Sequence, residues 1–213
     1  MSDLLEVKNL SVSFRTPQGE LEAVRDVSFS VRAGEVLAVV GESGCGKSVL
    51  CKSIMKLLPR DAWIKGGTVL ADETDITAFG QREMERLRGR LFSMVLQDPM
   101  TALTPTIPIG KQIAEAVRVH QPRLSRQAVR RRVLELLELV GIDRPEDRCG
   151  LCPHSFSGGL RQRVVMAIAL ASGPKLLFAD EPTTALDVTV QAQILDLLRD
   201  VQACLGMAAV LVT

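Results

Sequence analysis

The feature that most constrains the fold of this sequence is a glycine-rich segment between an apolar run and a helical pattern. Residues 41–48 read Gly-Glu-Ser-Gly-Cys-Gly-Lys-Ser, which matches G-x-x-x-x-G-K-S/T in full. The apolar run Val36–Val40 precedes it, and a helical pattern that Pro59 ends follows it. This order is typical of a phosphate-binding loop. Because the preceding run has no polar position, we expect a strand buried on both faces of a parallel sheet.

The loop predicts contacts to the phosphates of a nucleotide. Glycines let backbone N–H groups converge on phosphate oxygens, and the N-terminus of the following helix adds a positive dipole end. We expect Lys47 to reach the β- and γ-phosphates and the Ser48 hydroxyl to coordinate Mg²⁺. The loop residues that we expect to bind the nucleotide are Gly41, Ser43, Gly44, Cys45, Gly46, Lys47, Ser48 and Val49.

Two carboxylates follow a second apolar run. The run is Leu176–Ala179, and Asp180 and Glu181 come directly after it. Mg²⁺ requires hard oxygen ligands, so Asp180 is predicted to belong to the metal shell. Glu181 is predicted to orient and polarise the water that attacks the γ-phosphate.

The order of elements indicates an α/β core that a helical insert interrupts. Leu4–Val12 and Ala23–Val31 read as strands, and strand character returns at Leu176–Ala179 and Ala208–Val212. Between them, a helical period dominates from about Pro99 to Ala171.

A serine and two glycines begin the last helix of this insert. Ser157 can cap that helix, and Gly158 and Gly159 make its start a second possible anion site. Alone, these residues fit a plain helix cap equally well. Two further elements make it improbable that the combination arose by chance. They are Gln97 before the insert and residues 184–187, Thr-Ala-Leu-Asp, after the carboxylates.

Together these motifs resemble the nucleotide-binding domain of ABC transporters, in the right order and over essentially the whole chain. The resemblance implies a P-loop NTPase (RecA-like) core with an N-terminal antiparallel β region. It further implies one domain in which residues 1–98 and 172–213 form the α/β core and residues 99–171 form the helical subdomain with the signature motif.

The same resemblance implies a division of roles at the site. Two subunits pair head to tail, and ATP lies between the loop of one and Ser157, Gly158 and Gly159 of the other. Gln97 senses Mg²⁺ and the membrane subunits, Asp187 lies at the dimer interface, and Phe14 stacks on adenine. The implied catalytic residues are Lys47, Gln97 and Glu181, and the implied metal residues are Ser48, Gln97 and Asp180.

Two longer segments are similar to importers of dipeptides, oligopeptides and nickel. They are residues 97–105 and Pro153–Arg163. The sequence departs from that pattern at Thr104, where Asn is usual, and at Cys152, where an aromatic residue is usual. The resemblance implies an ATPase subunit of a peptide importer, with nickel or another small solute as the alternative cargo. The implied partners are permease subunits, a second ATP-binding subunit and, indirectly, a substrate-binding protein. The implied location is the cytoplasmic face of the membrane.

Composition and spacing argue against other classes. The chain has 26 Lys+Arg, 25 Asp+Glu and 3% aromatic residues, so neither a basic field nor a stacking surface for nucleic acid is expected. Asn9 is the only asparagine, which excludes the Asn-Lys-x-Asp motif of GTPases. The stretch from Gln97 to Ser157 is too short for the coiled coil of chromosome-maintenance ATPases, although a soluble non-transport ABC ATPase remains the alternative of a different class.

We assign no functional role to two further clusters of residues. Cys149 and Cys152 have metal-ligand spacing without a second pair of ligands, so we interpret them as incidental. We interpret residues 130–132, three arginines, as a solvated helix face.

The resemblance also leads us to expect a C-terminally incomplete domain. In the family, the strand corresponding to Val210–Val212 is followed by a switch histidine and further strands. Neither His120 nor His154 stands there, so we do not expect efficient hydrolysis from residues 1–213 alone. An apolar strand in this terminal position is expected to lack protection.

Overall fold

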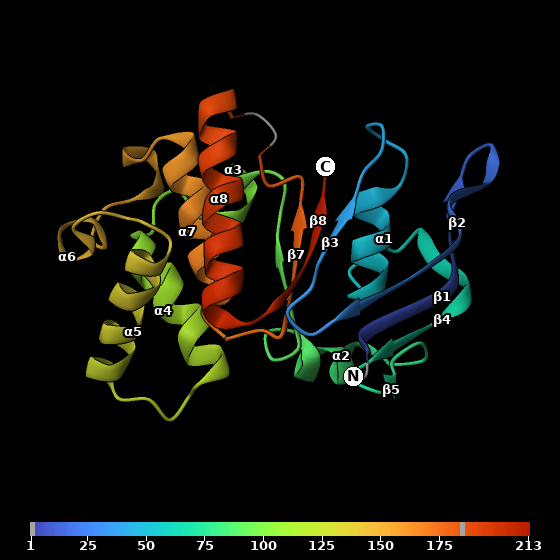
Figure 1. Cartoon of the computed structure of the whole chain (residues 1–213), viewed down its shortest axis with the longest axis horizontal. Helices are drawn as coiled ribbons and strands as arrows, with labels where there is room; N and C mark the ends of the chain where they lie inside the picture. Colours follow the sequence, from blue (N-terminus) through green and yellow to red (C-terminus); the bar gives the residue numbers. More distant parts are fainter. Residues whose placement is uncertain (1–2, 184–185) are drawn as a thin grey trace.

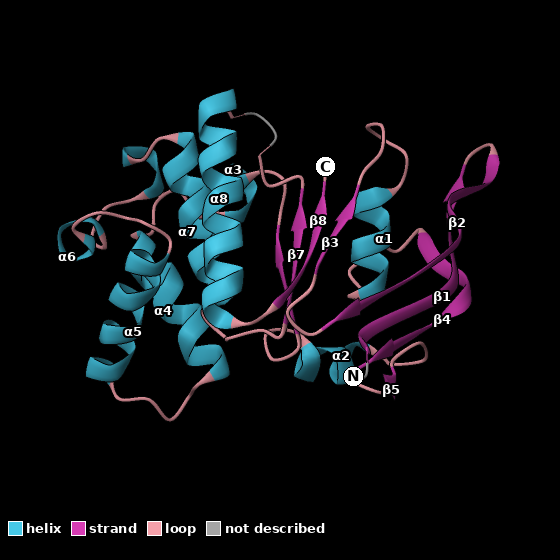
Figure 2. Ribbon diagram, viewed as in Figure 1, coloured by secondary structure: helices cyan, strands magenta, loops and turns pink. Residues whose placement is uncertain are grey.

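The computed structural model describes residues 3–183 and 186–213, which form two sheets and a block of helices (Figures 1 and 2). The antiparallel sheet lies at the right of Figure 1, the parallel sheet in the centre and most helices at the left. Within the described ranges, no helix is long and apolar enough to cross a membrane.

The antiparallel sheet has the strand order β2-β1-β4-β5. Its strands are β1 (Asp3–Thr16), β2 (Gly19–Arg32), β4 (Ala62–Ala71) and β5 (Thr74–Asp75). The two strands expected at the N-terminus are confirmed, and both are longer than expected. The strands β4 and β5 were not predicted from the sequence.

The parallel sheet has the order β3-β8-β7-β6. Its strands are β3 (Val36–Val39), β6 (Phe92–Val95), β7 (Leu176–Asp180) and β8 (Ala208–Val212). All five residues of β7 are buried, as expected for an inner strand with helices on both sides. β6 had not been identified.

The prediction that the strand before the loop is buried on both faces is wrong. Among the described residues, β3 is an edge strand that pairs with β8 alone, and Val36 at its start is 49% exposed. Leu37 and Val39 point toward the packed side, whereas Val36 and Ala38 are exposed. An apolar run indicates that both faces of a strand can be buried. Whether each face is buried depends on the position of the strand in the sheet and on what packs against it.

The expectation for the last strand also needs correction. β8 lies between β3 and β7 and pairs with both, so its backbone is protected on each side. Of its residues, Ala208, Ala209, Val210 and Val212 are buried. This strand is therefore an inner strand of the sheet and not an unprotected one.

Three helices accompany the sheets, and the others form the helical block. The first group is α1 (Lys47–Ile54), α2 (Gln81–Leu87) and α8 (Val188–Leu205). The block comprises α3 (Pro99–Ala102), α4 (Ile109–His120), α5 (Arg126–Leu139), α6 (Pro145–Arg148), a 3-10 turn (Pro153–Ser155) and α7 (Gly158–Leu170). The division into a core and a helical subdomain stays a prediction.

Local signals predicted the two long helices of the block well. The Ser125 hydroxyl accepts a hydrogen bond from the Ala128 N–H at 3.2 Å and so caps α5, and Gly141 beyond its end has φ 70°. Ser157 caps α7 in the same way. The helix after the loop ends earlier than expected, at Ile54, because Lys56 takes φ 53°.

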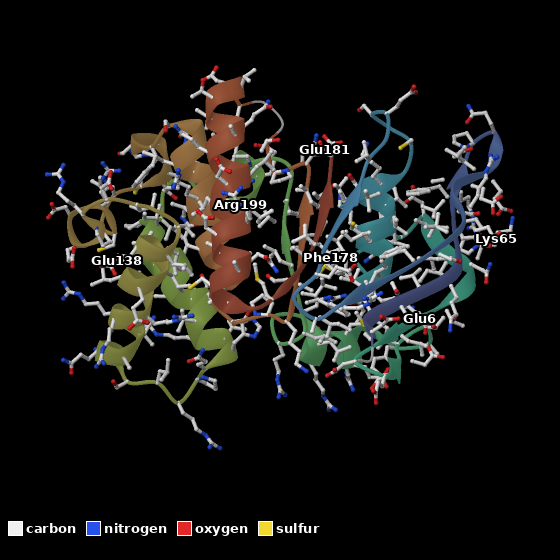
Figure 3. All side chains as sticks on the ribbon, viewed as in Figure 1. Glu6, Lys65, Glu138, Phe178, Glu181 and Arg199 are labelled. Atoms are coloured by element: carbon white, nitrogen blue, oxygen red, sulfur yellow. The ribbon has the colours of Figure 1, made fainter. Side chains whose placement is uncertain are left out.

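The strand β7 divides the interior into two clusters. Leu177 and Ala179 pack with α4, α5, α7 and α8, whereas Leu176 and Phe178 pack with α1 and the antiparallel sheet. Figure 3 labels Phe178 in the middle of the molecule. Alternating side chains of one strand thus join both layers and hold the carboxyl end of β7 in place.

Candidate nucleotide-binding site

The predicted phosphate loop connects β3 to α1 and depends on its glycines. Gly44 and Gly46 have φ 79° and 98°, in the left-handed region that favours glycine. A side chain at Gly46 would also overlap the carbonyl oxygen of Ala23 in β2. Within the described chain, no side chain caps α1, so the N–H groups of its first turn stay available to an anion.

Lys47 lies under this loop and is only 7% exposed. Its Nζ donates hydrogen bonds to the carbonyl oxygens of Gly41 and Glu42, each at 2.8 Å. The same ammonium lies 3.8 Å from Oε1 of Glu181. A buried cation is therefore held between the loop and a carboxylate, where it can neutralise a bound phosphate.

Ser48 and Asp180 meet although they are distant in the sequence. The Ser48 hydroxyl donates a hydrogen bond of 2.6 Å to Oδ1 of Asp180, which is 1% exposed at the end of β7. The contact forms because α1 begins beside the carboxyl end of β7. A hydroxyl and a carboxylate oxygen are hard ligands, so this pair fits a Mg²⁺ ion that also binds water and phosphate.

Glu181 forms the next contact at this edge of the sheet (Figure 3). Its Oε2 accepts a hydrogen bond of 2.8 Å from Nε2 of Gln97, two residues beyond the end of β6. Its backbone has φ 44° and donates a hydrogen bond to the Val212 carbonyl oxygen. Left-handed backbone at a non-glycine residue is costly and often occurs at functional sites.

The structure brings together Gly41, Lys47, Ser48, Gln97, Asp180 and Glu181. Of the other predicted loop residues, Ser43 and Cys45 are exposed, and Val49 lies half-buried in α1. Cys51, one turn after Lys47 in α1, is buried, and this burial raises the pKa of its thiol to about 12.

Ser157, Gly158 and Gly159 lie instead at the start of α7, in the helical block (Figure 1). The Ser157 hydroxyl accepts a hydrogen bond from the Leu160 N–H at 3.4 Å. A Cβ atom on Gly159 would lie 2.6 Å from Cγ1 of Val190 in α8. The described residues show no hydrogen bond between these residues and the loop.

Two predicted residues have different surroundings. Asp187 is exposed at the N-cap position of α8, while Thr184 and Ala185 beside it lie outside the described residues. Phe14 is half-buried in β1, opposite Leu21 and Ala62.

The strand β2 also contributes to the site, which was not predicted from the sequence. Ala23, Val24 and Val27 line a hollow of about 430 Å³ together with Gly46 and Lys47 of the loop. Apolar walls beside a phosphate loop suit the flat face of a nucleobase. No local pattern marks these residues, because the contact depends on how the two sheets pack.

Comparisons with known proteins identify the family of this chain. The family model described as "ABC transporter" matches residues 24–184. The chain is 52% identical to the oligopeptide transport ATP-binding protein OppD of Bacillus subtilis, covering 99% of this chain and 59% of that protein. It is 50% identical to the dipeptide transport ATP-binding protein DppD of the same organism, covering 100% of this chain and 64% of that protein. It thus spans less than two thirds of either relative.

Solved structures share the fold. The dimeric post-hydrolysis state of the ATP-binding cassette MJ0796, bound to ADP and Pi, superposes with a TM-score of 0.85 at 26% identity, covering 98% of this chain and 87% of that one. For cbiO1 of Clostridium perfringens the TM-score is 0.84 at 27% identity, with coverage of 100% and 79%. The family match over most of the sequence and the shared cassette fold show that this chain belongs to the ABC transporter family.

Proposed function

We propose that this chain is the ATP-binding and ATP-hydrolysing part of a subunit that energises an importer of dipeptides or oligopeptides. The observation that carries the proposal is the convergence of Lys47, the Ser48–Asp180 pair and the Gln97–Glu181 pair at one edge of the parallel sheet. The printed names of the two Bacillus subtilis relatives support a peptide cargo. Nickel or another small solute is the alternative cargo.

Each residue of this edge has a role that follows from its chemistry. ATP supplies the phosphoanhydride bond, and Mg²⁺ neutralises charge on its phosphate oxygens. The Lys47 ammonium exchanges loop carbonyl oxygens for phosphate oxygens. Ser48 and Asp180 supply metal ligands, and the carbonyl oxygen of the Gln97 amide is a third. Glu181 orients the attacking water and accepts its proton, while the Gln97 N–H holds the carboxylate in place.

We infer that a second ATP-binding chain completes the site. Ser157 and the two glycines after it begin a capped helix, which is a good anion site, yet they lie in the helical block and not at the loop of the same chain. A head-to-tail pair would bring them to the loop of the other subunit. That MJ0796 is described as dimeric supports this arrangement. The second chain is a copy of this one or a related cassette.

A groove of about 790 Å³ beside Gln97 is our candidate seat for the permease. Its lining includes Leu96, directly before Gln97, and Val119, Val165 and Ile168 of the helical block. Leu96 and Val119 are 38% and 68% exposed, which favours an apolar partner. A permease helix there would place this chain at the cytoplasmic face of the membrane, where a substrate-binding protein acts on it only indirectly. No nucleic acid is involved.

The test of the catalytic assignment is ATP turnover by the assembled transporter. We expect Glu181→Gln to lower the rate by about 100-fold or more, since the variant retains the hydrogen-bonding shape but cannot accept the proton. Lys47→Ala is the control that abolishes ATP binding itself. A Glu181→Gln transporter that hydrolyses ATP as fast as the wild type would show that the assignment is wrong.

The test of the cargo is uptake by the same transporter in vesicles. Peptide uptake that needs ATP and that Glu181→Gln abolishes is the expected result. Uptake of nickel without peptide uptake would favour the alternative cargo, and ATP turnover without any permease in the purified complex would favour a soluble non-transport ATPase.

A further inference from the structure

A second groove lies between α4 and α5, away from the residues assigned above. The two helices are joined by residues 121–125 and lie side by side at the left of Figure 1, far from the phosphate loop. The hollow between them measures about 750 Å³. We call it the α4–α5 groove and define it by its lining residues: Lys111, Ala114, Glu115 and Arg118 of α4, Arg126, Val129, Arg130, Val133 and Leu134 of α5, and Ile107 and Cys149.

The groove has an apolar floor. Val129 and Val133 lie beneath it in the core of the helical block, 1% and 4% exposed, whereas Ile107, 38% exposed, adds apolar surface that water reaches. Ala114 and Leu134 are half-buried beside them. Two neighbouring helices with an apolar seam between them form the kind of groove that receives a third helix through its apolar face.

The rim of the groove is basic. The rim carries four cationic side chains and one carboxylate, Glu115, and all five residues are exposed. The cationic side chains are those of Lys111, Arg118, Arg126 and Arg130. Within the described residues, none of the four cations uses its side chain in a hydrogen bond or ion pair. Arg132, on the same helix but outside the groove, does pair with Glu135 at 3.3 Å. Since the whole chain has a formal net charge of +1, this is a local concentration of positive charge.

These observations discriminate between kinds of occupant. A simple anion would leave the apolar floor exposed to water. A membrane surface cannot enter a hollow between two helices, because a bilayer presents a flat face. An amphipathic helix with acidic flanks would cover the apolar floor and pair its carboxylates with the basic rim. Arginine commonly forms such ion pairs and is enriched at protein interfaces.

The α4–α5 groove is also separate from the candidate permease seat. The candidate permease seat uses Ala116, Val119 and His120, which lie on a different face of α4 from Lys111 and Arg118. We therefore propose that the α4–α5 groove docks an acidic amphipathic helix of a partner protein. This inference does not depend on the proposed transport function.

Direct binding tests the proposal. The probe is a dye-labelled synthetic helix of about 14 residues, four turns, with Leu at i, i+3, i+4 and i+7 and Glu on both flanks. A peptide with Lys in place of every Glu and phosphatidylglycerol vesicles are the comparison ligands. We expect the acidic peptide to bind the chain, measured by fluorescence anisotropy, and neither comparison ligand to do so.

A matched pair of variants locates the binding. Arg126→Glu/Arg130→Glu reverses two charges four residues apart on α5, and we expect about tenfold weaker binding. Arg82→Glu/Arg86→Glu reverses two exposed charges with the same spacing on α2, and we expect less than about twofold change. The uncharged Arg126→Gln/Arg130→Gln variant gives an intermediate loss and guards against misfolding, which circular dichroism monitors.

Cysteine footprinting gives an independent readout. Cys149 lines the groove, and Cys204 lies exposed on α8. We expect the acidic peptide to slow alkylation of Cys149 and to leave Cys204 unchanged, as read by mass spectrometry.

Several outcomes would overturn the proposal. They are absence of peptide binding, equal loss in both charge-reversed pairs, and unchanged alkylation of Cys149. Binding of vesicles in place of the peptide would assign the surface to a membrane. Self-association of the chain that Arg126→Glu/Arg130→Glu abolishes would assign it to a second copy.

Discussion

At the scale of single residues, the site is built from close contacts that leave little freedom. Gly46 can adopt its left-handed backbone and approach Ala23 only because it lacks a side chain. Lys47 and Ser48 follow it directly and contact Glu181 and Asp180. Positioning of the reactive groups therefore depends on the backbone of one residue.

Replacing Gly46 tests this dependence. We expect Gly46→Ala to lower the free energy of unfolding by about 2 kcal/mol or more and to abolish ATP binding, because the new methyl group meets the Ala23 carbonyl. Urea denaturation and nucleotide titration measure the two effects. Gly150→Ala is the control: its Cβ would meet nothing within 4 Å, so both properties should stay unchanged. Normal ATP binding by Gly46→Ala would contradict the assigned loop geometry.

The buried thiol of Cys51 makes the stability of the protein depend on pH. Burial raises its pKa to about 12 from an ordinary value of 9.0, so the folded protein keeps the thiol neutral while the unfolded chain ionises it. Stability should thus fall as the pH rises from 9 toward 12. At pH 8, we expect iodoacetamide to modify the exposed Cys45 in the folded chain and Cys51 only after unfolding, as mass spectrometry would show. Equal modification rates in the folded chain would contradict the buried position.

At the scale of elements, local signals predicted helix boundaries better than sheet positions. Ser125 and Ser157 cap α5 and α7 where the sequence placed them, because a cap needs only the backbone of the next three residues. The apolar run Val36–Val40 correctly indicated a strand but not its place at the edge of the sheet. Strand order depends on how helices and connections pack, which no single segment encodes.

The two capping serines offer a matched comparison. Ser125→Ala and Ser157→Ala should each lower the free energy of unfolding by about 1 kcal/mol, since each removes one helix cap. Only Ser157→Ala should also lower ATP turnover of the assembled transporter, because we propose that Ser157 contacts the ATP bound to the other subunit. Denaturation curves and phosphate release distinguish the two effects. Equal ATP turnover by both variants would show that Ser157 serves only as a helix cap.

At the scale of the whole molecule, the two halves of the proposed ATP site lie apart. The phosphate loop adjoins the parallel sheet, whereas Ser157 begins a helix of the helical block (Figure 1). Mixing variants in the Glu181→Gln background tests whether two chains share a site. We expect Lys47→Ala and Ser157→Glu chains to remain monomers separately and to form an ATP-dependent dimer together, since the mixture restores one complete site. Size-exclusion chromatography measures this, and a Ser157→Glu chain that dimerises alone would contradict the shared site.

The local motifs could be predicted from the sequence alone: the glycine loop, the two carboxylates after an apolar run and the capped helix starts. These follow from short-range backbone geometry and from residue types that phosphate and Mg²⁺ require. Three contacts could be seen only in the folded chain: Ser48 meets Asp180, Gln97 holds Glu181, and β2 lines the hollow beside the loop. The tertiary structure also decided that β3 lies at an edge and that a basic groove opens between α4 and α5. Such contacts join distant segments, so they depend on the packing of both sheets and the helical block around one core strand.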